Sequence, residues 1–212
     1  MAVRSRTHVS CFLSVFAVFL ALSAGTISAQ IPKTNGSALR SDMRKLWEDH
    51  ITWTRLYIVS AAANLPDKGV TAKRLLRNQD EIGNAIKPYY GDAAGTKLTG
   101  LLKTHIMIAT EIIDAAMTGD NAGKANALRR WGVNGDEIAT FLSTANHVSW
   151  PLVPMKGMMR SHLDLTTQEV VAQLTKDWVG SVAAYDKIHD QILSMADMLS
   201  EGIVRQFPQQ VR

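Results

Sequence analysis

The feature that most constrains the fold is a helical pattern that occurs three times along the chain. His50, His105 and His162 follow one another at intervals of about 55 residues. Each has an apolar residue four positions before it, one immediately after it and one three positions after it: Leu46, Ile51 and Trp53; Leu101, Ile106 and Ile108; Met158, Leu163 and Leu165. This spacing places apolar residues on one face of an α-helix. Each histidine is therefore predicted to lie in the buried stripe of its helix and to point into the interior.

A second signature follows each histidine helix. The segment NQDEIGNAI at 78–86 matches NGDEIATFL at 134–142 and, more loosely, IHDQILSMA at 188–196. Turn-forming residues separate the paired segments. Because a single helical hairpin cannot bury both of its apolar faces, we expect an all-α bundle of three tandem hairpins with about six helices. The third unit has a weak turn, LTKDWVGSV, so its two helices could instead form one long helix kinked near Gly180.

The two ends of the chain are predicted to lie outside this bundle. Residues 1–29 resemble a signal peptide, because two arginines precede an apolar run of about 15 residues and small residues precede Gln30. We predict cleavage after Ala29, with an uncleaved anchor helix as the alternative. Asn35 begins an Asn-Gly-Ser sequence that would be a glycosylation site in a eukaryotic cell. The expected divisions are a signal peptide at 1–29, a linker at 30–40, the helical bundle at 41–207 and a tail at 208–212.

Charge and cysteine content narrow the function classes. Cys11, the only cysteine, lies in the leader, so the exported chain would have no disulfide and would depend on its core for stability. Loss of the leader removes two of the 23 basic residues and none of the 19 acidic ones, so the net charge falls from +4 to about +2. Such a balanced surface gives no reason to expect nucleic acid as a partner. No later apolar run reaches about 18 residues, so we expect a secreted or periplasmic protein without stable membrane insertion after leader cleavage.

The repeat also places a carboxylate near the depth of each histidine. In antiparallel hairpins, Asp80, Asp136 and Asp190 would lie within about one helical turn of the histidine level. One interpretation is a structural layer, in which each buried imidazole forms a hydrogen bond with a neighbour. The other is a metal site, because bundle cores build such sites from histidines and carboxylates on facing helices. Zn, Fe or Cu would suit these ligands.

Two further patterns bear on the metal interpretation. The sequence DKIH places Asp186 and His189 at i, i+3, the spacing of the acid-x-x-His element in di-iron bundles, although only one copy is present and it carries Asp in place of Glu. The sequence MKGMMRSH places Met155, with Met158 or Met159, on one helical face with His162. Thioether and imidazole together suit Cu(I), but a methionine stripe is also common core filling.

The sequence lacks the motifs of nucleophilic catalysis and of nucleotide binding. The exported chain has no cysteine nucleophile, no G-x-S-x-G elbow and no glycine-rich phosphate loop, so no catalytic residues are predicted. We expect a non-catalytic binding or interaction protein, whose partner is a small ligand, a metal ion or a protein. The alternatives are a metal-dependent enzyme that uses the same His/Asp layer and a purely structural cell-envelope protein.

Several segments resemble an uncharacterised, mostly bacterial family of helical proteins. They are LWEDHITWTR, LLRNQDEIGNAIKPYYG, RRWGVNGDEIATFL, YDKIHDQILSMADMLSEGI and the final RQF, and the resemblance covers residues 41 to 207. Members are sometimes automatically named acetylglutamate kinase or glycosyltransferase, but both activities would need nucleotide-binding α/β domains that the helical pattern excludes. The resemblance supports the domain boundaries and implies no site residues.

Overall fold

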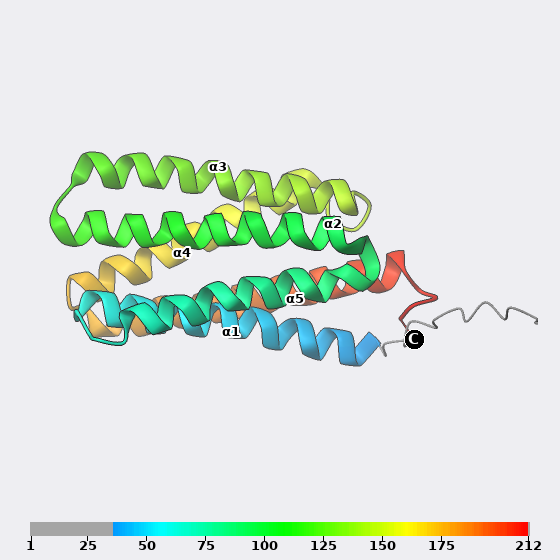
Figure 1. Cartoon of the computed structure of the whole chain (residues 1–212), viewed down its shortest axis with the longest axis horizontal. Coiled ribbons are helices and arrows are strands. Elements are labelled where there is room, and N and C mark those ends of the chain that lie inside the picture. Colours follow the sequence, from blue (N-terminus) through cyan, green and yellow to red (C-terminus); the bar gives the residue numbers. More distant parts are fainter. Residues whose placement is uncertain (1–35, 212) are drawn as a thin grey trace, which may run out of the picture. The chain divides into compact units, whose positions relative to one another are not determined.

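A computed structural model describes residues 36–211, and every regular element in that range is a helix (Figure 1). The predicted all-α class is therefore confirmed. The signal peptide, its cleavage site and Asn35 lie outside the described residues. The helices are α1 (Gly36–Ala62), α2 (Lys68–Thr118), α3 (Asn121–Ala145), α4 (Leu152–Leu174) and α5 (Trp178–Gln206).

The described residues form five helices where about six were predicted, and the difference arises within α2. This helix of 51 residues contains Pro88 and leaves the helical conformation at Gly91, where φ is 83° and ψ is 166°. Such a conformation is accessible mainly to glycine, which has no Cβ. Figure 1 shows that the chain reverses direction there, so the two halves of α2 (68–90 and 92–118) run antiparallel. A break of one residue thus separates two segments that were predicted as different helices.

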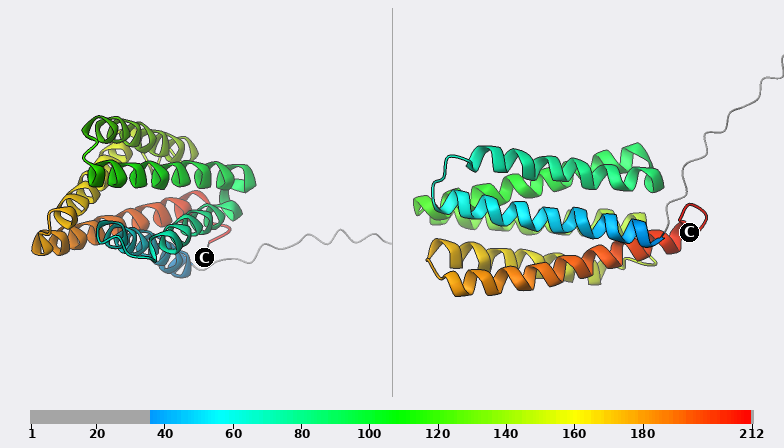
Figure 2. Two further views of the ribbon diagram at one scale, coloured as in Figure 1. Left: turned by 60° about the vertical axis from the view of Figure 1, so that its left-hand side comes forward. Right: turned by 90° about the horizontal axis from the view of Figure 1, so that it is seen from below.

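The helices between residues 36 and 211 pair as three hairpins, which differ from the prediction because α2 supplies a helix to two of them. They are α1 with the first half of α2, the second half of α2 with α3, and α4 with α5. Figures 1 and 2 show the three hairpin turns at one end of the bundle and the connections between hairpins at the other. We call the first end the tip end. The hairpins pack on one another where α5 contacts α1 and α3 contacts α4.

The weak turn of the third unit is a complete hairpin turn, so the alternative of one kinked helix is wrong. Helix α4 ends at Leu174 and α5 begins at Trp178. Lys176 adopts a positive φ of 62°, and the Asp177 carboxylate accepts a hydrogen bond of 2.9 Å from the Gly180 backbone N–H. An aspartate in this position caps the N-terminus of a helix. Asp120 caps α3 in the same way through the Gly123 N–H, also at 2.9 Å.

The bundle extends further at both ends than the sequence indicated. Helix α1 begins at Gly36, within the predicted linker, because Leu39 and Met43 continue its buried stripe. Val211, in the predicted tail, is also buried and belongs to the main core cluster. None of the helices between residues 36 and 211 is both long enough and apolar enough to span a membrane.

The two halves of α2 approach each other closely at two glycines, Gly83 and Gly95. A Cβ on Gly83 would lie 2.7 Å from the Gly95 carbonyl oxygen and would collide with Thr99. We therefore expect Gly83→Ala to lower the free energy of unfolding by about 1–3 kcal/mol, the usual cost of overpacking. Gly100→Ala is the matched control, because nothing lies within 4 Å of its Cβ position. The control should stabilise the protein slightly, by about 0.5–1 kcal/mol. Equal effects in urea denaturation would contradict the close approach.

Candidate functional site

The three repeated histidines meet in the interior of the bundle. His50 on α1, His105 on the second half of α2 and His162 on α4 are 3%, 3% and 5% exposed. The ring centroids of His50 and His162 are 5.8 Å apart, and those of His105 and His162 are 6.2 Å apart. We call these three residues the histidine layer. The prediction that all three point into the interior is confirmed.

Each layer histidine contacts an amide side chain located 29 residues later, on the returning helix of its own hairpin. His105 Nδ1 lies 2.9 Å from Asn134 Oδ1. His162 Nδ1 lies 3.2 Å from Gln191 Oε1. His50 Nδ1 lies 3.3 Å from Gln79 Nε2. The constant separation shows that the three hairpins share one register at this level.

In each hairpin an amide at this level also joins the two helices by a hydrogen bond to a backbone carbonyl oxygen. Asn134 Nδ2 donates to the Leu101 carbonyl oxygen at 3.1 Å, and Gln191 Nε2 donates to the Met158 carbonyl oxygen at 3.3 Å. In the first hairpin Asn78 makes this bond, with the Leu46 carbonyl oxygen at 3.0 Å. The acceptor is always the residue four positions before the histidine. Each hairpin therefore joins its two helices through a buried amide.

The predicted partners of the histidines, Asp80, Asp136 and Asp190, are wrong. Asp80 forms an ion pair with Lys103 at 2.7 Å, and Asp136 forms one with Lys156 at 3.1 Å. Asp190 is exposed. Asp80 and Asp136 lie two residues after inward-facing asparagines, and two residues correspond to a rotation of roughly 200° around an α-helix. The sequence placed these carboxylates at the right depth but on the wrong face.

The residues predicted as metal ligands do not form one group. Asp186 is exposed, and His189 Nε2 lies 3.0 Å from Glu48 Oε1 at the surface. Between residues 36 and 211, no three or more His, Cys, Asp or Glu side chains are placed to hold a metal ion. Met155 and Met159, the predicted thioether ligands, are buried in the main core cluster.

The hydrogen bonds assign the tautomers of His105 and His162. Asn134 and Gln191 use their N–H groups on backbone carbonyls, so their side-chain oxygens accept from Nδ1–H of His105 and His162. Both rings therefore have an unprotonated Nε2. Gln79 Nε2 donates its two N–H groups to the Leu75 carbonyl oxygen and to Asn78 Oδ1, and it also lies 3.3 Å from His50 Nδ1.

All three histidines are held in the neutral form. Burial lowers the pKa of His105 to about 3 and that of His162 to about 4. Burial, followed by the charges that His162 and His105 would carry, lowers the pKa of His50 well below its usual value. An imidazolium would lose its hydration in this interior without gaining a counter-charge. The layer is therefore a neutral hydrogen-bonded structure at physiological pH.

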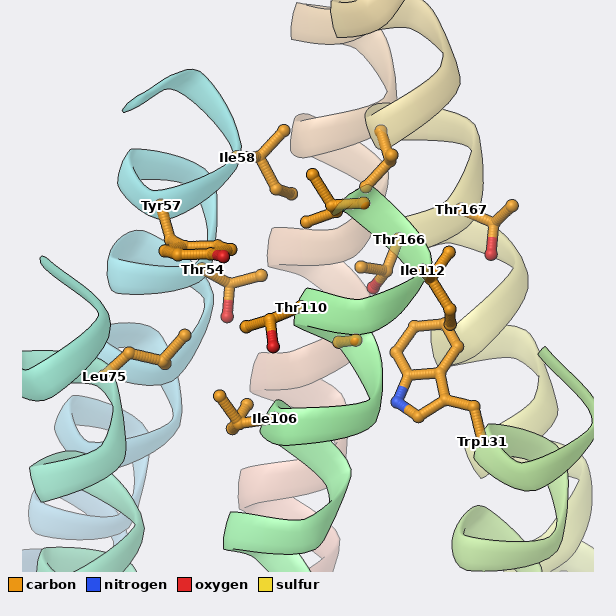
Figure 3. A pocket seen from close by; sticks show the side chains of 13 residues that line it. Thr54, Tyr57, Ile58, Leu75, Ile106, Thr110, Ile112, Trp131, Thr166 and Thr167 are labelled. Atoms are coloured by element: carbon orange, nitrogen blue, oxygen red, sulfur yellow. The ribbon is translucent and has the colours of Figure 1, made fainter. Parts of the chain in front are cut away.

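An apolar cavity lies next to the layer, toward the tip end. It has a volume of about 30 Å³, and residues of all three hairpins line it (Figure 3). Thr54 and Thr166, one helical turn beyond His50 and His162, belong to its wall. The full lining is Thr54, Tyr57, Ile58, Leu75, Ile106, Ala109, Thr110, Ile112, Ile113, Trp131, Thr166, Thr167 and Val170.

The threonine hydroxyls of this wall are hydrogen-bonded to their own helices. Thr54 donates to the His50 carbonyl oxygen at 2.7 Å, and Thr166 donates to the His162 carbonyl oxygen at 2.9 Å. Thr110 and Thr167 also donate to carbonyl oxygens of their own helices, each at 2.8 Å. With these donors occupied, the wall offers a guest mostly methyl, methylene and aromatic surface.

Sequence reasoning missed the residues that surround the histidines. The amides lie within NQDEI, NGDEI and IHDQI, and the constant offset of Gln79, Asn134 and Gln191 from the histidines was the available signal. Trp131, which lines the apolar cavity and donates to the His105 carbonyl oxygen at 3.1 Å, carried no repeat signal. Comparisons with protein-family models, with curated proteins and with solved structures found no match to this chain.

Proposed function

We propose that this chain is a non-catalytic binding protein for a small, uncharged, apolar molecule, and that the apolar cavity at the tip end is its binding site. The observation that carries the proposal is the composition of the cavity wall. None of its thirteen residues, all in the described part of the chain, is charged. A charged ligand would lose its hydration there without a counter-charge, whereas an apolar ligand would gain from leaving water.

The position of the cavity also supports a binding role. Two separate clusters of buried apolar side chains lie beside it, one including Ile58 and Ile113 and the other including Ile112 and Trp131. Elsewhere, a single larger cluster draws on all five helices. The core is thus divided where the three hairpins meet, and a guest in this place would contact all of them.

The neighbouring histidine layer provides polar groups next to one end of the apolar cavity. Its amide hydrogen bonds fix the helices that carry the cavity wall, so the wall is positioned before a ligand arrives. A mostly apolar wall with a few fixed polar groups is the composition of small-molecule sites, although those sites usually have volumes of roughly 300–1,000 Å³. The volume of about 30 Å³ limits the guest to a few non-hydrogen atoms. Export through the leader is part of the same proposal. An intact mass equal to that of a chain beginning at Gln30 would support export.

Filling the cavity tests this function. Ala109→Leu adds apolar volume to the wall, and Ala125→Leu adds the same side chain at an exposed position of α3 that lines no cavity described above. Crystals pressurised with xenon should show xenon in the cavity of the wild type and of Ala125→Leu, and none in Ala109→Leu. Xenon is a suitable probe because dry apolar cavities bind it.

A solution measurement complements the xenon experiment. Xenon dissolved under pressure should raise the melting temperature of the wild type and of Ala125→Leu, because a ligand that binds only the folded state stabilises it. The shift should be smaller or absent in Ala109→Leu. Equal shifts in all three proteins, or a wild-type cavity without xenon, would refute the proposed site.

A further inference from the structure

A second, smaller cavity lies within the histidine layer. Its volume is about 10 Å³, and its wall contains His50, His105, His162 and Trp47 together with apolar side chains. The apolar members are Leu102, Ile138, Leu142, Met159 and Met195. A buried site holds one water molecule when the volume open to its centre reaches roughly 10–15 Å³. The cavity therefore has the size of a single water.

Trp47 provides a polar atom without a partner at this cavity. Its side chain is only 5% exposed, and its indole Nε1 has no hydrogen-bond partner among the described residues. The indole nitrogen can only donate a hydrogen bond. Buried donors in native proteins are normally paired with protein atoms or with ordered water. The wall thus contains an N–H group that needs an acceptor.

The histidines supply the complementary groups. Their Nδ1 atoms contact the amide side chains, which leaves Nε2 as the ring nitrogen for the cavity. According to the tautomers assigned above, Nε2 of His105 and of His162 are acceptors. Together with the Trp47 N–H donor, they give the wall one donor and two acceptors, and His50 Nε2 is a fourth polar group.

We propose that one ordered water molecule occupies the cavity in the histidine layer and bridges Trp47 Nε1 to the imidazole rings. A water molecule can accept a hydrogen bond from Trp47 Nε1 and donate one each to Nε2 of His105 and of His162. A metal cation would face the N–H group of Trp47. A halide ion would face the lone pairs of His105 and His162. The bound water connects the three hairpins at their common level, in addition to the amide that joins the helices within each hairpin.

Proton NMR tests the bridge in solution. The indole N–H of Trp47, identified as the resonance lost in Trp47→Phe, should show a cross-peak with a long-lived bound water. Trp150 is the matched control, because its side chain is 1% exposed and its Nε1 donates to the Met198 carbonyl oxygen at 3.2 Å. The Trp150 indole N–H should show no such cross-peak. Absence of the Trp47 cross-peak, or equal cross-peaks from both residues, would overturn the proposal.

A crystal structure of the wild type provides a second test. The expected result is one peak of electron density in the cavity, within hydrogen-bond distance of Trp47 Nε1, that refines as a fully occupied water. Anomalous diffraction at the absorption edges of Zn, Fe and Cu should show no signal there. An empty cavity, or an anomalous peak at this position, would overturn the inference.

Discussion

Acidification from neutral pH to about pH 5 is expected to lower the free energy of unfolding by about 4 kcal/mol through His105 and His162 alone. Both side chains have an ordinary pKa of 6.5, and the folded protein lowers the pKa to about 3 and about 4. Each pH unit between the two values costs about 1.4 kcal/mol for each histidine. His50, whose pKa is lowered in the same direction, adds to the loss.

The sign of this effect follows from proton binding. Below pH 6.5 the unfolded chain protonates its histidines, while the folded layer remains neutral. The unfolded state then binds more protons, so stability falls as the pH falls. The contribution of the neutral histidines to the free energy of unfolding is fully present above about pH 6.5. It is lost progressively as the pH falls toward their pKa values in the folded protein. Asp136 and Asp197, whose pKa values are lowered mainly by hydrogen bonds to Lys156 and Arg40, lose their contributions only below their ordinary value of 3.8.

Glu169, a buried acid, has the opposite effect on stability as the pH falls. Burial raises the pKa of Glu169, which is 2% exposed and pairs with Arg55 at 2.5 Å. A carboxyl group with a raised pKa binds its proton more readily in the folded state, so it opposes part of the acid destabilisation. Since it is a single group and the layer contains three histidines, the net effect should remain a loss of stability.

Denaturant unfolding at a series of pH values measures the prediction. The wild type should take up two to three protons on unfolding near pH 5.5, by the linkage relation. His162→Gln should reduce this uptake by about one proton. A stability that is constant between about pH 7 and pH 5 would contradict a neutral buried layer.

The all-helical class and the buried face of each helix could be predicted because the helical pattern recurs along the sequence. An apolar stripe at helical spacing defines which face of each helix is buried, and three copies with similar spacing define how the helices pair. This reasoning correctly placed His50, His105 and His162 in the interior. It did not show that the chain could reverse within one residue at Gly91.

The partners of the histidines could not be predicted by the same reasoning. The depth of a residue along a helix follows from counting, because each residue adds a constant rise. Its direction depends on which neighbour faces inward, and here the apolar positions left both asparagine and aspartate as candidates. A buried neutral imidazole is better matched by an amide than by a carboxylate, because a buried carboxylate would need its own counter-charge. The ion pairs of Asp80 and Asp136 with lysines at the surface agree with this reason.

The two cavities also could not be predicted from the sequence. A cavity is the space that packed side chains leave, so it depends on rotamers and on the approach of helices, which no periodic pattern encodes. Thr54 and Thr166 occur at the same offset from their histidines, but Ala109 stands at that offset in the second hairpin. The repeat therefore indicated a common level beyond the histidines without indicating an open space there.

Replacing the amide of the second hairpin should distinguish the observed partner from the predicted one. Asn134→Ala removes the acceptor of His105 Nδ1–H and the donor to the Leu101 carbonyl oxygen, which both lie in the interior. We expect the free energy of unfolding to fall by about 2–4 kcal/mol, because an unsatisfied buried polar group costs about 1–3 kcal/mol and a small void adds to this.

Asp136→Ala is the matched control, two residues along the same helix. Its carboxylate is 31% exposed and pairs with Lys156 and Arg160, so its removal should cost much less stability than Asn134→Ala, because surface ion pairs contribute little. Urea denaturation near neutral pH measures both variants. A larger loss for Asp136→Ala than for Asn134→Ala would restore the carboxylate as the functional partner. The expected result, a larger loss for Asn134→Ala, would mean that the neutral amides stabilise the histidine layer. They form hydrogen bonds with the imidazole rings without introducing a charge.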